Sequence, residues 1–95
     1  MNTNIFYVGL DLGSSHCYQV VMNEGGKIIR SRPFVTCEQN LRFAFQGFDD
    51  DLLVHTEAGE LTNWVCGIIK PMVKRVVVSH PRSLAWIAKD RAQMR

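Results

Sequence analysis

The sequence predicts an α/β fold built on a mixed five-stranded sheet, with three antiparallel strands followed by α-β-α-β-α. Two observations predict this class. In the first third of the chain, apolar runs of strand length alternate with turns that contain glycine, and further along apolar residues recur at helical spacing between short apolar runs. The 95 residues suffice for one domain, and 46% hydrophobic with 21% charged residues is ordinary for a globular one. We therefore expect residues 1–95 to form a single domain.

The first strand is expected at Ile5 to Asp11, a nearly continuous apolar run typical of a strand buried on both faces. The glycine-serine-serine corner at 13–15 then turns the chain into a second strand over 16–22.

A hairpin follows at 23–26, where the sequence Asn-Glu-Gly-Gly is a strong turn signal. The third strand therefore runs over 27–35, antiparallel to the second. Arg30, Arg32 and Pro33 within it favour an edge position in the sheet.

The first helix is predicted after Thr36, which fits a capping box with Gln39. Its apolar face comprises Leu41, Ala44, Phe45 and Phe48. A fourth strand, 52–57, ends in Glu57, and Gly59 precedes the second helix. The apolar stripe of that helix comprises Leu61, Trp64, Val65, Ile68 and Met72.

The fifth strand is expected at 75–79, which contains three consecutive valines. Pro81 suits the first position of a last helix, whose apolar residues are Leu84, Ile87 and Ala88. This order of elements is that of the ribonuclease H-like fold, whose sheet sets the first strand beside the fourth.

Asp11 and Glu57 are the candidate catalytic and metal-binding residues, because each closes an apolar strand. The carboxyl ends of parallel strands form the edge where α/β sheets usually place their chemistry. Two carboxylates crowded there repel unless a cation intervenes, and Mg²⁺ prefers such oxygen ligands. The alternative for either acid is a helix-capping or salt-bridged role. His55 shares a face with Glu57 and is expected to be a partly buried histidine rather than a ligand.

Charge is unevenly distributed along the chain. Residues 1–69 hold four Lys or Arg against eight Asp or Glu, whereas residues 70–95 hold seven against one. The excess of basic residues over 70–95 is expected if this end of the chain binds phosphates, although a solvated helix face explains it equally well. The three cysteines never form a C-x-x-C pair, so reduced and mostly buried thiols are expected. No apolar run approaches the roughly 20 residues that span a bilayer, and no signal pattern opens the chain, so the cytoplasm is the expected location.

Three segments carry a resemblance to a known family: YVGLDLGSSHCYQVVMNEGGKIIR, LLVHTEAGE and KRVVVSHPRSLAWIAKDRAQMR. They resemble the N-terminal, RuvC-like catalytic domain of bacterial insertion-sequence transposases of the DEDD type. The family's first acid falls on Asp11 and its second on Glu57. The resemblance implies Mg²⁺- or Mn²⁺-dependent cleavage and rejoining of DNA, and in many members a guide RNA. It makes the basic residues of the last segment candidates for DNA contacts, namely Arg82, Lys89, Arg91 and Arg95.

Two departures from the family pattern bear on this expectation. The stretch after Glu57 reads Ala-Gly-Glu and lacks the family's threonine, and the family's last two acids would follow Arg95. We therefore expect residues 1–95 to be a truncated domain, inactive alone, with no metal necessarily bound and with a tendency to form homo-oligomers.

Two other readings stay open. The stretch GLDLGSS also resembles the first phosphate loop of the actin and sugar-kinase superfamily, in which backbone N–H groups at 13–15 would hold ATP phosphates. The remaining reading is a non-enzymatic module that occupies DNA ends or dimerises.

Overall fold

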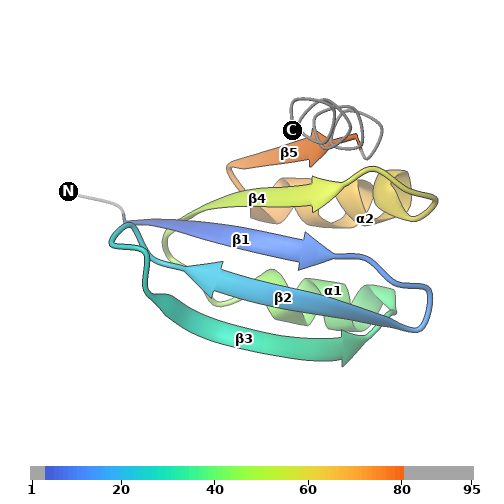
Figure 1. Ribbon diagram of the computed structural model, residues 1–95, viewed down its shortest axis with the longest axis horizontal. Coiled ribbons are helices and arrows are strands. Elements are labelled where there is room, and N and C mark those ends of the chain that lie inside the picture. The colour runs from blue at the N-terminus through green and yellow to red at the C-terminus, as the bar shows by residue number, and fades with distance from the viewer. Residues whose placement is uncertain (1–3, 81–95) are drawn as a thin grey trace, which may run out of the picture.

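One mixed sheet organises the structure, with strand order β3-β2-β1-β4-β5 (Figure 1). The computed structural model describes residues 4–80. The strands are β1 (Ile5–Asp11), β2 (His16–Met22), β3 (Ile28–Val35), β4 (Asp51–Glu57) and β5 (Arg75–Ser79). The pairs β1–β2 and β2–β3 are antiparallel, whereas β1–β4 and β4–β5 are parallel. The predicted α/β class, the five-stranded mixed sheet and the edge position of β3 are confirmed.

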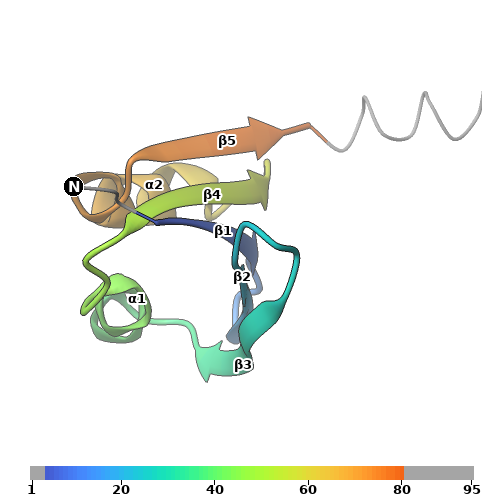
Figure 2. The same ribbon diagram turned by 90° about the vertical axis from the view of Figure 1, so that its left-hand side faces the viewer.

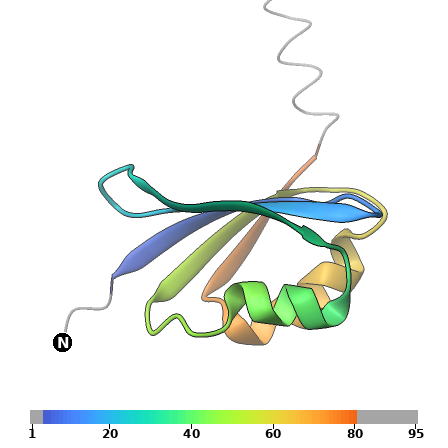
Figure 3. The same ribbon diagram turned by 90° about the horizontal axis from the view of Figure 1, so that it is seen from below.

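Two helices pack on one face of the twisted sheet, as Figures 2 and 3 show. They are α1 (Glu38–Phe45) and α2 (Thr62–Ile69), and a short 3₁₀ turn, η1 (Lys70–Met72), follows α2. The core between helices and sheet is apolar and includes Val8, Leu10, Cys17, Val21, Leu41, Ala44, Phe45, Leu52, Val54, Val65, Ile68 and Ile69. All three cysteines are free thiols, and Cys17 is the buried one.

The expectation that β1 is buried on both faces is wrong. Its residues alternate, so that Val8 and Leu10 are buried whereas Tyr7, Gly9 and Asp11 are exposed. The reason is that, within residues 4–80, both helices lie on the same side of the sheet. The opposite side of the sheet, here called the open face, is therefore lined by exposed side chains.

The start of α1 differs from the predicted capping box. The N-cap is Cys37, whose sulfur accepts a hydrogen bond from the Asn40 N–H at 3.4 Å. Thr36 is engaged elsewhere, because its Oγ1 donates to the Gly13 carbonyl oxygen at 2.7 Å and its N–H donates to the Ser15 carbonyl oxygen at 2.9 Å. These tertiary bonds hold Thr36 beside the β1–β2 turn, so the helix begins after it.

The apolar stripes of both helices also shift from prediction. Helix α1 ends at Phe45, and Gly47, with a φ of +84°, turns the chain away. Phe48 consequently lies outside the helix and packs on Phe6, with ring centroids 5.9 Å apart. In α2 the buried residues are Thr62, Val65, Ile68 and Ile69. Trp64 is 43% exposed, because the helix faces the sheet with a stripe rotated from the predicted one.

The predicted last helix, with Leu84, Ile87 and Ala88, lies outside the described residues. Within the described part of the chain, no helix is both long and apolar enough to cross a membrane.

Candidate functional site

Asp11 and Glu57 end two neighbouring parallel strands. The register of β1 and β4 pairs Leu10 with Thr56, the residues immediately before the two acids. Because the strands are parallel and in register, the acids lie at the same edge of the sheet. Both side chains are exposed, and both belong to the open face. The prediction that the first and fourth strands lie side by side is confirmed.

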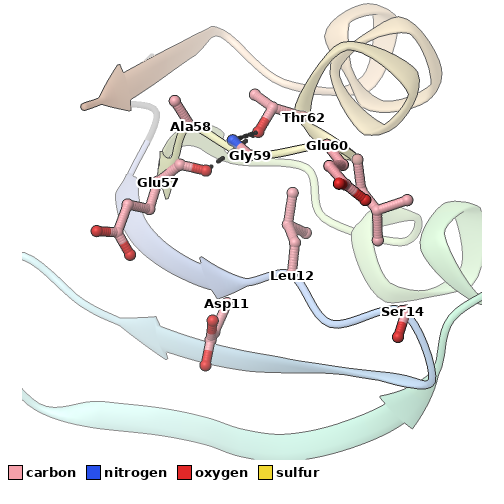
Figure 4. Close-up of a pocket in the computed structure, with 9 residues that line it drawn as sticks. Asp11, Leu12, Ser14, Glu57, Ala58, Gly59, Glu60 and Thr62 are labelled. Atoms are coloured by element: carbon pink, nitrogen blue, oxygen red, sulfur yellow. Dashed lines mark hydrogen bonds between the residues drawn. The ribbon is translucent and has the colours of Figure 1, made fainter. Parts of the chain in front are cut away.

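Figure 4 shows how the two acids, here called the acid pair, lie relative to their surroundings. Their carboxyl groups extend to the same side of the strands, and none of the other side chains drawn stands between them. Within residues 4–80, neither carboxylate takes part in a salt bridge, since the ion pairs there are Arg42–Glu38 and Lys74–Asp51. The salt-bridged alternative for these acids therefore finds no support in the described residues.

A hydrogen bond fixes the strands that carry the acid pair. Thr56 is buried, and its Oγ1 donates to the Leu10 carbonyl oxygen at 2.8 Å. This side-chain bond adds to the ladder between β1 and β4 one residue before each acid. It restrains the relative position of the two backbones, and hence the separation of the carboxylates.

The loop after Glu57 is held by a second threonine. Thr62 Oγ1 accepts a hydrogen bond from the Gly59 N–H at 2.7 Å and donates to the Glu57 carbonyl oxygen at 3.1 Å. Glu57 is thus anchored at its backbone (Figure 4), whereas its side chain is exposed. Sequence reasoning missed both threonines. The only signal was the position of Thr62 near the start of a helix, where threonine often binds backbone N–H groups.

Two hollows meet at the acid pair. One, of about 250 Å³, extends toward α2 and is lined by the pair together with Leu12, Ser14 and residues 58–62. The other, of about 370 Å³, lies on the open face, where Tyr18, His55 and Ser79 join the pair. Asp11 and Glu57 therefore line both hollows.

The donor set fits a hydrated divalent cation. Two exposed carboxylates supply hard oxygen ligands, and Mg²⁺ is commonly held by one or two carboxylates while it keeps several waters. Ser79, which pairs with Glu57 in the β4–β5 register, has a buried Oγ with no hydrogen-bond partner among the described residues. Within residues 4–80, no three His, Cys, Asp or Glu side chains are grouped closely enough to form a fuller metal site.

His55 is exposed on the open face, opposite Gly9 in the register. The expectation that it is partly buried is wrong, for the same reason as for β1. It lines the second hollow beside Glu57.

The turn at 13–15 is held by one local contact and by two hydrogen bonds from Thr36. Ser15 Oγ lies 2.8 Å from His16 Nδ1, and the carbonyl groups of Gly13 and Ser15 accept from Thr36. Ser14 lines the same hollow as Asp11. The candidate DNA-binding residues Arg82, Lys89, Arg91 and Arg95 lie outside the described residues.

Comparison with known proteins found neither a protein-family model nor a curated protein that matches this sequence.

Proposed function

We propose that the chain is the N-terminal part of a metal-dependent DNA transposase or recombinase with a ribonuclease H-like fold. Asp11 and Glu57 would hold Mg²⁺ or Mn²⁺. One observation carries the proposal, namely that these acids close adjacent parallel strands in register, at the same edge of the sheet. The order β3-β2-β1-β4-β5 supports the fold assignment, because it is the order that this fold requires.

The chemistry follows from the accessibility of the acid pair. A bound divalent cation would supply charge stabilisation at a phosphodiester and lower the pKa of a coordinated water. The protein's own contribution is to hold two carboxylates at a set spacing through the Thr56 and Thr62 hydrogen bonds. The hollow on the open face, which both acids line, is where a DNA strand would approach the pair. Two acids form half of the site that the family uses, so we expect no Mg²⁺-dependent nuclease activity from residues 1–95 alone.

The proposed partners follow from the same assignment. The substrate is DNA of a mobile element and its target, a guide RNA is a second nucleic-acid partner, and the location is the bacterial cytoplasm. Arg82, Lys89, Arg91 and Arg95 remain proposed DNA contacts, on the basis of charge alone.

Thermal unfolding with and without Mn²⁺ or Mg²⁺ tests the metal site. At a metal concentration of about ten times Kd, a ligand that binds the folded state stabilises it by about 1.4 kcal/mol, or several degrees in melting temperature. We expect this rise for the wild-type chain and its loss in Asp11→Asn and in Glu57→Gln. Asp49→Asn, which removes an exposed carboxylate outside both hollows, is the matched control and keeps the rise.

The other outcomes distinguish the rival functions. A rise that Asp11→Asn leaves intact would overturn the metal site. Stabilisation by Mg-ATP but not by Mg²⁺ alone would favour the phosphate-loop reading. DNA binding that is sensitive to salt but indifferent to divalent metal would favour a passive DNA-end module.

A further inference from the structure

Basic residues gather where the edge strand β3 faces helix α1. Residues 1–69 contain four Lys or Arg against eight Asp or Glu, and three of those four basic residues lie in β3 or α1, namely Arg30, Arg32 and Arg42. Arg42 is neutralised by Glu38 at 3.0 Å. Arg30 and Arg32, by contrast, form no ion pair with any carboxylate in the part of the chain that the structure describes. Two neighbouring guanidinium groups therefore lack a counter-ion there.

Both of these guanidinium groups are held against aromatic rings. The Cζ atom of Arg30 lies 5.0 Å from the ring centroid of Phe48, and that of Arg32 lies 5.8 Å from the ring centroid of Phe43. Arg30 also donates from Nη1 to the Ala44 carbonyl oxygen at 3.4 Å. Both arginines are partly buried, so water screens their charge less than it screens a fully exposed one. A guanidinium that lies over a ring keeps N–H donors at its edge, where a phosphate can accept hydrogen bonds.

Phe43 adds an exposed aromatic ring to this group. It is 59% exposed, and the Arg32 guanidinium lies over the same ring. Unpaired arginines beside an exposed ring are the combination with which proteins bind single-stranded nucleic acids, because the arginines contact phosphates while the ring stacks on a base. A base within a duplex is already stacked and paired, so it is not available to such a ring. The arrangement therefore favours a single strand over a duplex.

We propose that Arg30, Arg32 and Phe43, here called the arginine edge, bind a single-stranded nucleic acid. The two arginines are two residues apart on one side of a strand, so their Cα atoms lie about 7 Å apart and both can contact the same extended backbone. Strand β3 is the outermost strand at its end of the sheet (Figure 1), which gives a ligand room to run along it. The arginine edge lies on the helix side of the sheet and the acid pair lies on the open face. The inference therefore goes beyond the proposed metal site and does not depend on it.

Binding of labelled oligothymidylate and oligouridylate to the full chain, measured by fluorescence anisotropy with Mg²⁺ present, tests the proposal. Arg30→Gln and Arg32→Gln should each weaken binding severalfold and lower the slope of log Kd against log salt concentration by about 0.7, the value for one phosphate contact on a single strand. Phe43→Ala should weaken binding about tenfold and leave this slope unchanged, because it removes stacking and no charge. Lys70→Gln is the matched control. It removes an equal charge beside β5, at the opposite edge of the sheet, and should change Kd by less than about twofold.

The possible outcomes separate this role from a structural one. Binding of either single strand supports the proposal, and the tighter of the two identifies the ligand as DNA or RNA. Arginine variants that melt earlier but bind as wild type does would show that the arginines only brace α1 against β3, and would overturn the proposal. Equal losses in Lys70→Gln and the arginine variants would overturn it too, as would equal affinity for a duplex of the same length.

Two features keep the test informative. If the arginine variants fail to fold, Phe43→Ala still tests the proposal, because this mostly exposed ring can be removed without opening the core. Unchanged binding in Phe43→Ala would then overturn the proposal. The arginine and Phe43 variants should also keep the rise in melting temperature with Mn²⁺, so failure of the arginine edge and failure of the metal site give different results.

Discussion

The most informative single substitution is Thr56→Val, because it removes one hydroxyl and keeps the shape of the side chain. Thr56 is 2% exposed, and its Oγ1 donates to the Leu10 carbonyl oxygen at 2.8 Å. Leaving a buried acceptor without its donor costs about 1–3 kcal/mol, whereas burying a methyl in place of the hydroxyl returns about 0.8 kcal/mol. The expected net loss in the free energy of unfolding is about 1 kcal/mol, or about 4–8 °C in melting temperature for a domain of this size.

The same substitution has a second expected effect, on the acid pair. The lost bond lies one residue before Asp11 and Glu57, so both strand ends gain freedom and the rise in melting temperature with Mn²⁺ should shrink. Thr56→Ser is the control, since it keeps the donor and loses only a methyl group. It should lower stability while leaving the response to Mn²⁺ intact.

Urea unfolding measures the change in the free energy of unfolding. We expect the slope of this free energy against urea concentration to be the same for wild type, Thr56→Val and Thr56→Ser. Metal titrations followed by melting temperature measure metal binding at the acid pair. A Thr56→Val protein as stable as wild type, with the same response to Mn²⁺, would refute the role assigned to this hydrogen bond.

Two further substitutions test the packing. Gln19→Met should leave the free energy of unfolding unchanged or raise it. Gln19 is fully buried and its Oε1 has no hydrogen-bond partner among the described residues, so removing this oxygen offsets the loss of the bond that Nε2 donates to the Ala44 carbonyl oxygen at 3.0 Å. A loss of more than about 1 kcal/mol in urea unfolding would contradict this. Gly13→Ala should destabilise by about 1–3 kcal/mol, because the added Cβ would overlap the carbonyl oxygen of His16. Gly67→Ala should instead stabilise by up to about 1 kcal/mol, because in residues 4–80 the added Cβ would meet no atom within 4 Å apart from the nearby backbone of α2 itself. Equal effects of the two glycine substitutions would show the reasoning to be wrong.

The strands were predictable because each is a short apolar run bounded by a turn, and this signal is local. The order of the elements along the chain matched that of the ribonuclease H-like fold, which sets the first strand beside the fourth, so the adjacency of Asp11 and Glu57 could be predicted from that likeness. The one-sided burial of β1 could not, because Tyr7 and Gly9 are apolar residues that nevertheless lie on the open face.

In both helices, tertiary contacts override the local sequence pattern. Apolar residues surround α2 on several sides, and only its docking on the sheet decides that Val65 is buried and Trp64 is not. Thr36 satisfies a capping pattern, but the Gly13 carbonyl oxygen, distant in sequence, accepts its hydroxyl proton instead. The Thr56 bond is equally invisible to local reasoning, since its partner is 46 residues away.

The 46-residue separation of Leu10 and Thr56 also determines when, during folding, the two acids become neighbours. The segment between the two acids contains the β2–β3 hairpin and α1, so the carboxylates meet only after the chain has returned to the central strand. Until then each acid is an ordinary solvated side chain with no affinity for a shared cation. An ion that bound both carboxylates would therefore bind only the folded chain, and its binding would stabilise that fold.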